Sequence, residues 1–210
     1  MSQEARNPDN HAVVALGIIL AGGEGRRMGG DKAFREVGGR SLMAMAIETA
    51  QLQCDAVMIS SNQTPDVFSQ FGLPVVADVP KPGQGPLGGV LAGLGALPDG
   101  IDWLVTFPVD CPILPADLVI RLISAASDAG VGAAFARHAG RDHYLSSAWH
   151  RDSASVIADL LGREERRVRG PLVAMNAVAV DFDSSDQPAL FANANTPDDL
   201  TYLGAILGAS

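Results

Sequence analysis

Cysteines, cations and long apolar runs are all scarce in this sequence. The two cysteines, Cys54 and Cys111, are too few and too far apart for a disulfide framework or a thiolate metal site, and reduced thiols suit the cytoplasm. There are 15 Lys and Arg residues against 24 Asp and Glu residues, and the net charge of −9 argues against nucleic acid or an anionic membrane as a partner. No apolar run approaches the roughly 20 residues of a membrane span. These absences predict a cytoplasmic protein.

The composition that remains is typical of a globular protein with a substantial core. Hydrophobic residues make up 47% of the 210 residues and charged residues make up 19%. The first 11 residues show no signal-peptide pattern, and we expect them to form a disordered leader. Residues 12–210 contain no linker that would divide them, so a single domain is expected.

Apolar, β-branched runs alternate with helical patterns along the chain. Predicted strands cover residues 12–20, 55–60, 73–77, 102–108, 132–136, 144–149 and 177–182, and predicted helices cover residues 42–53, 90–97, 115–129, 153–161, 166–174 and 197–207. Ser41 and Thr196 are suited to cap the first and last of these helices. The alternation predicts an α/β layered fold with a mostly parallel sheet, in which ligands bind at the carboxyl ends of strands.

A glycine-rich loop, LAGGEGRRMGGDK, follows the first predicted strand and spans Leu20 to Lys32. Glycines let backbone amides approach a ligand closely, and Arg26, Arg27 and Lys32 add positive charge, so the loop suits a polyphosphate. It is not a Walker A loop, because neither Ser nor Thr follows Lys32, and it is not a dinucleotide fingerprint, because Met28 stands where the third glycine belongs. The alternative is a solvated turn in which Lys32 meets only water.

Asp110 comes just after the predicted strand at 102–108, in a turn flanked by prolines. Because Mg²⁺ prefers carboxylate oxygens together with phosphate oxygens, Asp110 is a candidate metal ligand in a nucleotide site. The alternative is a carboxylate that caps the turn formed by residues 111–114. The neighbouring Cys111 is expected to be a small buried hydrophobic residue, since no base that would activate it is recognisable nearby.

Taken together, these motifs resemble the molybdenum cofactor guanylyltransferases, a MobA-like family with the nucleotide-diphospho-sugar transferase fold. The matching segments are the glycine loop, GPLGG at 85–89, FPVDCP at 107–112 and NANTPDDL at 193–200, with weaker matches in GRDH at 140–143 and EERRV at 164–168. The resemblance covers nearly the whole chain after the leader and implies a three-layer, Rossmann-like fold. It also implies transfer of GMP from GTP to molybdopterin with release of pyrophosphate, Mg²⁺ as cofactor, and cofactor-synthesis or cofactor-insertion proteins as partners.

The resemblance also implies a set of site residues. Arg27 and Lys32 are expected on the phosphates and Asp110 on Mg²⁺, and these three form the expected catalytic set. The residues expected to bind the nucleotide are Leu20, Ala21, Gly22, Gly23, Lys32, Asn62, Asp78, Gly85, Pro86 and Asp110. Where the family often places Asn near the base, this chain has Ser60, with Asn62 two residues further on.

A second group of residues is suited to the pterin. Arg137, Arg141 and His143 form a predicted cationic cluster between two strands, and Asn193 and Asn195 precede the last helix. The alternatives are a charged hairpin exposed to water and asparagines that only order a turn. The family commonly has Pro after the histidine, and this chain has Tyr there.

Two features favour guanine as the base. Cytidylyltransferases that resemble this chain typically have Ala at the place of Gly22, and GPLGG matches the guanine-using form. Cytidylyl and sugar-phosphate nucleotidylyl transfer remain alternatives within the fold. A glycosyltransferase that uses a nucleotide sugar usually carries two aspartates after the central strand, where this chain has only Asp110. A nucleotide-sensing module without catalysis would not need both Lys32 and Asp110.

Overall fold

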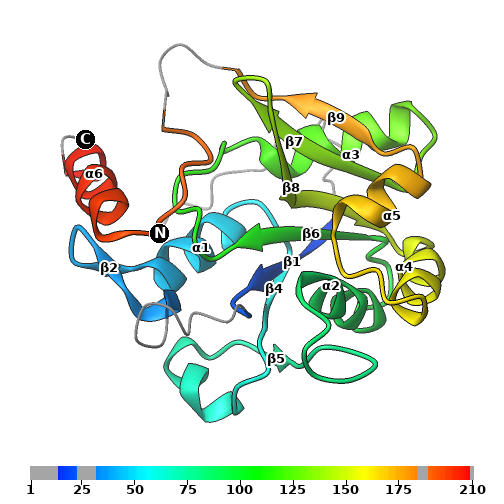
Figure 1. The fold of residues 1–210 in the computed structure, drawn as a ribbon, viewed down its shortest axis with the longest axis horizontal. Helices are drawn as coiled ribbons and strands as arrows, with labels where there is room; N and C mark the ends of the chain where they lie inside the picture. Colours follow the sequence, from blue (N-terminus) through cyan, green and yellow to red (C-terminus); the bar gives the residue numbers. More distant parts are fainter. Residues whose placement is uncertain (1–13, 23–31, 184–188, 209–210) are drawn as a thin grey trace, which may run out of the picture.

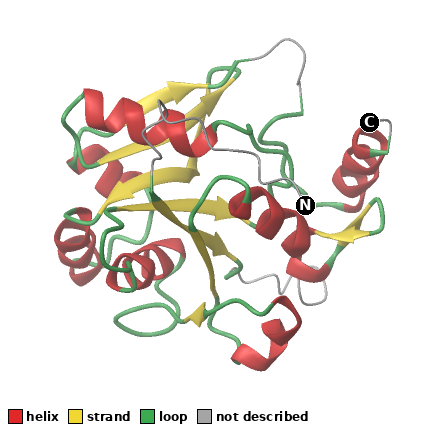
Figure 2. Ribbon diagram, turned by 180° about the vertical axis from the view of Figure 1, so that it is seen from behind, coloured by secondary structure: helices red, strands yellow, loops and turns green. Residues whose placement is uncertain are grey.

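The computed structural model describes residues 14–22, 32–183 and 189–208, which form a layered α/β fold around one large sheet (Figures 1 and 2). Its strands are β1 (Ala15–Leu20), β4 (Ala56–Ser60), β5 (Val75–Val76), β6 (Trp103–Pro108), β7 (Ala133–His138), β8 (Arg141–His150) and β9 (Val178–Asp181). The helices are α1 (Leu42–Gln51), α2 (Pro86–Gly95), α3 (Leu118–Asp128), α4 (Ser153–Gly162), α5 (Arg169–Ala174) and α6 (Pro197–Leu207). No helix within these residues has the length and apolar character needed to span a lipid bilayer.

The seven strands follow the order β5-β4-β1-β6-β8-β7-β9. β1 lies parallel to both β4 and β6, and β4 lies parallel to β5. β8 is antiparallel to β6 and to β7, and β9 is parallel to β7. The predicted α/β fold with a mostly parallel mixed sheet is therefore confirmed, and the carboxyl ends of β4, β1 and β6 meet at one edge.

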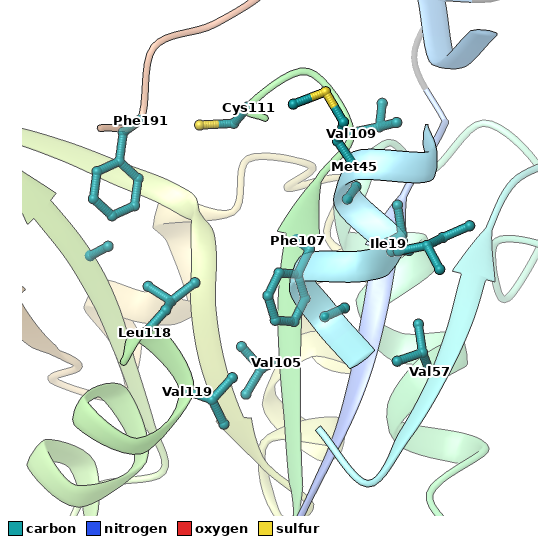
Figure 3. Close-up of a cluster of buried hydrophobic side chains, with 14 of the residues drawn as sticks. Ile19, Met45, Val57, Val105, Phe107, Val109, Cys111, Leu118, Val119 and Phe191 are labelled. Carbon is teal, nitrogen blue, oxygen red and sulfur yellow. The ribbon is translucent and has the colours of Figure 1, made fainter. Parts of the chain in front are cut away.

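Hydrophobic cores lie on both faces of the sheet, as expected for a sheet covered by helices on two sides. One core includes Ile19 of β1 and packs against α1 and α3; the other includes Ile18 and packs against α2, α4 and α5. Figure 3 shows part of the first core, in which Val105 of β6 is drawn beside Val119 of α3. All six residues of β1 are buried, which explains its continuous apolar run in place of alternation.

Both predicted helix caps are confirmed. The side chain of Ser41 accepts a hydrogen bond from the backbone N–H of Ala44 at 3.2 Å, which satisfies a donor in the first turn of α1. Thr196 and Asp199 form a reciprocal capping box at the start of α6.

Several predicted boundaries were wrong. α2 begins at Pro86 rather than at 90, because proline suits the first position of a helix. α3 begins at Leu118 rather than at 115, and α5 begins at Arg169 rather than at 166. Three short elements were not predicted: the hairpin of β2 (Glu36–Val37) and β3 (Arg40–Ser41), and the 3-10 helices η2 (Lys32–Phe34) and η3 (Pro65–Phe71).

Candidate active site

The ends of three adjacent strands bring distant residues together at one edge of the sheet. Leu20 at the end of β1 is paired with Ser60 of β4 on one side and with Pro108 of β6 on the other. Beyond these ends, Ala21 N donates to Ser60 O at 3.0 Å and Val109 N donates to Leu20 O at 3.4 Å. The segments that leave β1, β4 and β6 therefore start side by side.

A cavity of about 750 Å³ opens beside the ends of β1 and β4. Its lining residues are Leu20, Ala21, Gly22, Ser60, Ser61, Asn62, Gln63, Asp78, Pro82, Gly83, Gly85 and Pro86. Most residues expected to bind the nucleotide thus lie around one cavity: Leu20, Ala21, Gly22, Asn62, Asp78, Gly85 and Pro86. Gly23 lies outside the described residues, and Lys32 and Asp110 do not line the cavity.

Asp78 is held in the wall of this cavity by a dense set of hydrogen bonds. Its Oδ2 accepts from Asn62 Nδ2 at 2.8 Å and from the backbone amides of Gly83 at 3.2 Å and Gln84 at 3.1 Å. In return Asp78 N donates to Asn62 Oδ1 at 2.9 Å. The amide oxygen of Asn62 is therefore engaged within the protein, so Asn62 shapes the cavity mainly by holding Asp78.

The GPLGG segment is needed for a close approach between α2 and the cavity wall. A Cβ added at Gly89 would lie 2.2 Å from Ser60 Oγ, and one added at Gly88 would lie 2.7 Å from Asp78 Cβ. Both distances are impossible without movement of the chain. Gly85 has a φ of +67°, which favours glycine. These glycines let the amino end of α2 reach the ends of β4 and of the Asp78 loop.

Lys32, Asp110 and Asn195 come together next to this cavity, where β6 ends. Lys32 Nζ lies 2.6 Å from Asp110 Oδ2 and also donates a hydrogen bond to Asn195 Oδ1. Ala194 N donates to the backbone oxygen of Asp110 at 2.8 Å, which fixes the last segment against the turn after β6. Lys32, the turn after β6 and the segment before α6 thus meet at one charged point. Arg27 lies outside the described residues.

The predicted cationic cluster in the β7–β8 hairpin is not formed as expected. Arg137 is paired across the hairpin with Asp142, whereas His143 is paired with Ala136. Cross-strand partners share a face and successive residues point to opposite faces, so Arg137 and His143 lie on opposite faces of the sheet. Arg141 pairs with His138, on the same face as His143. The prediction placed these side chains together because the sequence does not reveal which face of the sheet each side chain takes.

Different partners occupy the two faces. Arg137 Nε lies 2.7 Å from Asp142 Oδ1, and the Tyr144 hydroxyl donates to Asp142 Oδ2 at 2.7 Å. The hydrogen bond from Arg137 is the largest influence that lowers the pKa of Asp142. On the other face, the ring of His143 stacks on Phe191 at 4.6 Å between centroids. Burial, aided by the charge of Arg141, lowers the pKa of His143 to about 4, so this imidazole is neutral at pH 7.

The family assignment can now be compared with known proteins. A family model described as the MobA-like NTP transferase domain matches residues 17–179. The chain belongs to this family of nucleotidyltransferases. A curated molybdenum cofactor guanylyltransferase of Rhodopseudomonas palustris is 41% identical over 194 residues, which cover 87% of this chain and 89% of that protein. The resemblance found in the motifs is confirmed.

Solved structures show the same fold. Molybdopterin-guanine dinucleotide biosynthesis protein A of Archaeoglobus fulgidus has a TM-score of 0.78 at 22% identity, with 93% of this chain and 100% of that chain covered. A Mycobacterium tuberculosis protein solved in complex with manganese has a TM-score of 0.64 at 14% identity, with coverages of 91% and 98%. Nucleotidyltransferases generally use a divalent metal.

The residues beside Lys32 are compatible with such a metal. Among the described residues, no group of three or more His, Cys, Asp or Glu side chains gathers into a metal site. Mg²⁺ does not require one, because it is usually held by one or two carboxylates with phosphate oxygens and waters as its other ligands. The carboxylate of Asp110 fits that pattern. Cys111 is buried, and burial raises the pKa of its thiol, as expected for a structural residue.

Two polar residues near the site were missed by the sequence argument. Gln84, which is almost fully buried, accepts a hydrogen bond from Arg166 at 2.9 Å and donates its backbone amide to Asp78. Asp199 contacts the backbone of Asn195. Arg166 lies in the EERRV segment and Asp199 in the NTPDD segment, both of which the sequence shows. The partner of Arg166, Gln84, is 82 positions away, and the contact of Asp199 with Asn195 depends on the geometry of the helix cap.

Proposed function

We propose that this chain is a molybdenum cofactor guanylyltransferase, which transfers GMP from GTP to molybdopterin and releases pyrophosphate. Its family and its relatives at about 40% identity support that activity. The observation that carries the proposal is the cavity at the ends of β1 and β4 with the Lys32–Asp110 pair beside it at the end of β6. A cavity of about 750 Å³ next to a focused charge pair suits a nucleoside triphosphate.

In the proposed complex, the base and ribose of GTP occupy the cavity and the phosphates extend toward Lys32 and Asp110. Leu20, Ala21 and Gly22 would meet the nucleotide, because they form the cavity wall nearest to β6. Asp78 would present its carboxylate to the base. Its Oδ2 already accepts hydrogen bonds from Asn62, Gly83 and Gln84, so Oδ1 is the oxygen suited to a ligand donor.

The chemistry requires two negative groups to approach one another. A terminal phosphate oxygen of molybdopterin attacks the α-phosphorus of GTP, the bond to the β-phosphate oxygen breaks, and pyrophosphate leaves with its electron pair. Positioning and charge neutralisation supply most of the catalysis in such a transfer. Lys32 would neutralise the departing pyrophosphate, with Arg27 as a further cation on the phosphates. Asp110 would hold Mg²⁺, which supplies further positive charge on the phosphates when bound.

The pterin is expected on the other side of β6. Arg141 and His143 share one face of the hairpin, and Phe191 stacks on His143 just before Asn193 and Asn195. A neutral imidazole and two carboxamides suit the polar edge of a pterin, and Arg141 suits its phosphate. Arg137 is already paired with Asp142 on the opposite face, so we place it outside this surface.

Guanine is the proposed base and the cytoplasm the proposed location. A Cβ at Gly22 would meet no atom of the described residues within 4 Å, so among these residues nothing blocks a large base there. A site built for the donors and acceptor of guanine leaves polar groups unpaired against cytosine, which costs binding. The free thiols of Cys54 and Cys111 suit a reducing compartment. Proteins that make or insert the cofactor are the expected partners.

One competition experiment tests the function. The full chain is incubated with Mg²⁺, molybdopterin and equal concentrations of GTP and CTP, and the products are identified by mass. We expect the guanine dinucleotide of molybdopterin and pyrophosphate. A cytosine dinucleotide as the main product contradicts the guanylyl assignment and favours the cytidylyl alternative. A parallel reaction that also contains a sugar phosphate tests the acceptor. If the sugar phosphate is nucleotidylated and molybdopterin is not consumed, the proposed acceptor is wrong.

A further inference from the structure

The capping box at the start of α6 makes one hydrogen bond more than a helix cap requires. Asp199 N donates to Thr196 Oγ1 at 3.1 Å, and Thr196 N donates to Asp199 Oδ2 at 2.8 Å, which completes the reciprocal box. The same oxygen, Asp199 Oδ2, also accepts from Asn195 N at 2.9 Å. Asn195 precedes the cap residue, so this additional bond satisfies no amide of the helix itself.

The additional bond completes the fixation of Asn195. The residue before it, Ala194, is fully buried and donates its amide to the backbone oxygen of Asp110. The amide of Asn195 is held by Asp199, and its side-chain oxygen accepts from Lys32 Nζ. Asn195 therefore lies between Asp199 on its backbone side and the ammonium of Lys32 on its side-chain side.

The electrostatics agree with this arrangement. Hydrogen bonds from Thr196, first from its backbone amide, and then from Asn195 lower the pKa of Asp199, and the positive charge of Lys32 lowers it further. The carboxylate is thus ionised near neutrality and is a strong acceptor for the Asn195 amide. Lys32 has a long, flexible stem, so a fixed acceptor beside Asp110 decides where its ammonium rests.

We propose that Asp199 is a positioning residue for Lys32: it fixes the backbone of Asn195, whose side chain holds the lysine ammonium beside Asp110. The inference rests on the proposed function, because Lys32 needs phosphates to serve. Lys32 matters most when charge develops on the leaving pyrophosphate, so a misplaced ammonium lowers kcat more than it weakens the binding of GTP.

Matched variants can separate positioning from helix capping. Asp199→Ala removes the two hydrogen bonds that the carboxylate accepts from Thr196 N and Asn195 N. Thr196→Ala removes the bond that Asp199 N donates to Thr196 Oγ1 and leaves Asn195 held. Asp198→Ala removes a second acidic residue from the same turn, one that makes no hydrogen bond or ion pair among the described residues. Asp199→Glu restores a carboxylate, and Glu is a usual partner in a capping box.

The full-length variants are assayed for kcat and for the KM of GTP with Mg²⁺ and molybdopterin, and their Tm is measured. We expect Asp199→Ala to lower kcat roughly tenfold with a GTP KM within about twofold of wild type. Asp199→Glu, Thr196→Ala and Asp198→Ala should keep kcat within about twofold, even though Thr196→Ala lowers Tm as Asp199→Ala does.

Two outcomes overturn the proposal: an unchanged kcat in Asp199→Ala, or an equal loss of kcat in Thr196→Ala, which would mean that the helix cap alone matters. The proposed function has a separate readout, because it requires the wild-type chain to form the guanine dinucleotide. A wild type without that activity contradicts the proposed function, and the role of Asp199 falls with it. An active wild type with either outcome above contradicts only the role of Asp199.

Discussion

Asn62 and Asp78 hold each other through two hydrogen bonds that run in opposite directions. The Asn62 amide nitrogen donates to the Asp78 carboxylate, and the Asp78 backbone amide donates to the Asn62 carbonyl oxygen. The pair ties the end of β4 to the loop that closes the cavity. Because Asp78 is only 9% exposed, loss of the Asn62 side chain leaves the Asp78 backbone amide without its hydrogen-bond partner, while Gly83 and Gln84 still donate to the carboxylate.

The first prediction follows from this pair. Asn62→Ala should lower the free energy of unfolding by about 1–3 kcal/mol, because two partly buried hydrogen bonds are lost, and should raise the KM of GTP. Thr64→Ala is the control, since the side chain of Thr64 makes no cap hydrogen bond in the next turn. Denaturant unfolding and steady-state kinetics measure the two effects. An unchanged KM would mean that Asp78 does not need Asn62 to meet the nucleotide.

Asp110→Asn should fold normally and lose nearly all turnover. The amide keeps the size of the side chain but removes the charge that holds Mg²⁺. The ion pair with Lys32 is about a quarter exposed on each side, at 28% and 24%, so its loss costs at most about 1 kcal/mol of stability. Thermal unfolding and kcat at saturating Mg²⁺ test the prediction. Turnover near the wild-type value would rule out the ligand role.

Lys32→Ala should lower kcat more than it raises the KM of GTP. The ammonium contributes most as charge builds on the departing pyrophosphate, which is an interaction of the transition state. Steady-state kinetics with varied GTP separates the two parameters. A rise in KM with kcat unchanged would show that the lysine binds the ground state and the transition state equally.

Two glycine substitutions should behave in opposite ways. Gly89→Ala forces a Cβ to within 2.2 Å of Ser60 Oγ, so we expect the variant to lose about 1–3 kcal/mol of stability. The added methyl of Gly22→Ala meets no atom of residues 14–22, 32–183 and 189–208 within 4 Å, so we expect the Tm to stay at the wild-type value while the KM for GTP rises more than that for CTP. Equal losses with both nucleotides would assign Gly22 to the turn alone.

Stability should depend on pH through His143. Its pKa is lowered to about 4 in the folded protein, from about 6.5 when unfolded, so between these values the unfolded chain binds more protons. The free energy of unfolding therefore falls as pH decreases from about 6.5 toward 4. His143→Phe keeps an aromatic ring against Phe191 and removes this titration. Denaturant unfolding across that pH range should show that the free energy of unfolding depends less steeply on pH in the variant than in the wild type. An unchanged dependence on pH would contradict the assignment to His143.

The features that short stretches of sequence determine were predicted correctly. The apolar run that became β1, the caps at Ser41 and Thr196, and the position of Asp110 after β6 all depend on short stretches of chain, and the structure agrees with each. Most of the residues predicted to bind the nucleotide lie around one cavity because parallel strands end at a common edge, which is a general property of such sheets.

Features that depend on strand register or distant contacts were not predictable. A shift in register between Phe135 and Ala136 helps to decide which face each hairpin side chain takes, and no residue pattern marks it. The contact of Lys32 with Asn195 spans 163 positions of the sequence, so no local pattern marks it. The GPLGG glycines suggested contact with a ligand. The structure shows that Gly88 and Gly89 also lie so close to Asp78 and Ser60 that a side chain at either position would clash with them.

The reversed direction of β8 affects how substrate specificity can change within this fold. Since β8 is antiparallel to β6, the turn between β7 and β8 lies toward the same edge at which β6 ends. In the proposed complex, β6 is then a border between a nucleotide half, built by β1 and β4, and an acceptor half, built by the hairpin and the segment before α6. Substitutions in the hairpin can alter the acceptor without disturbing the nucleotide half, so a change of substrate in this fold requires no second domain.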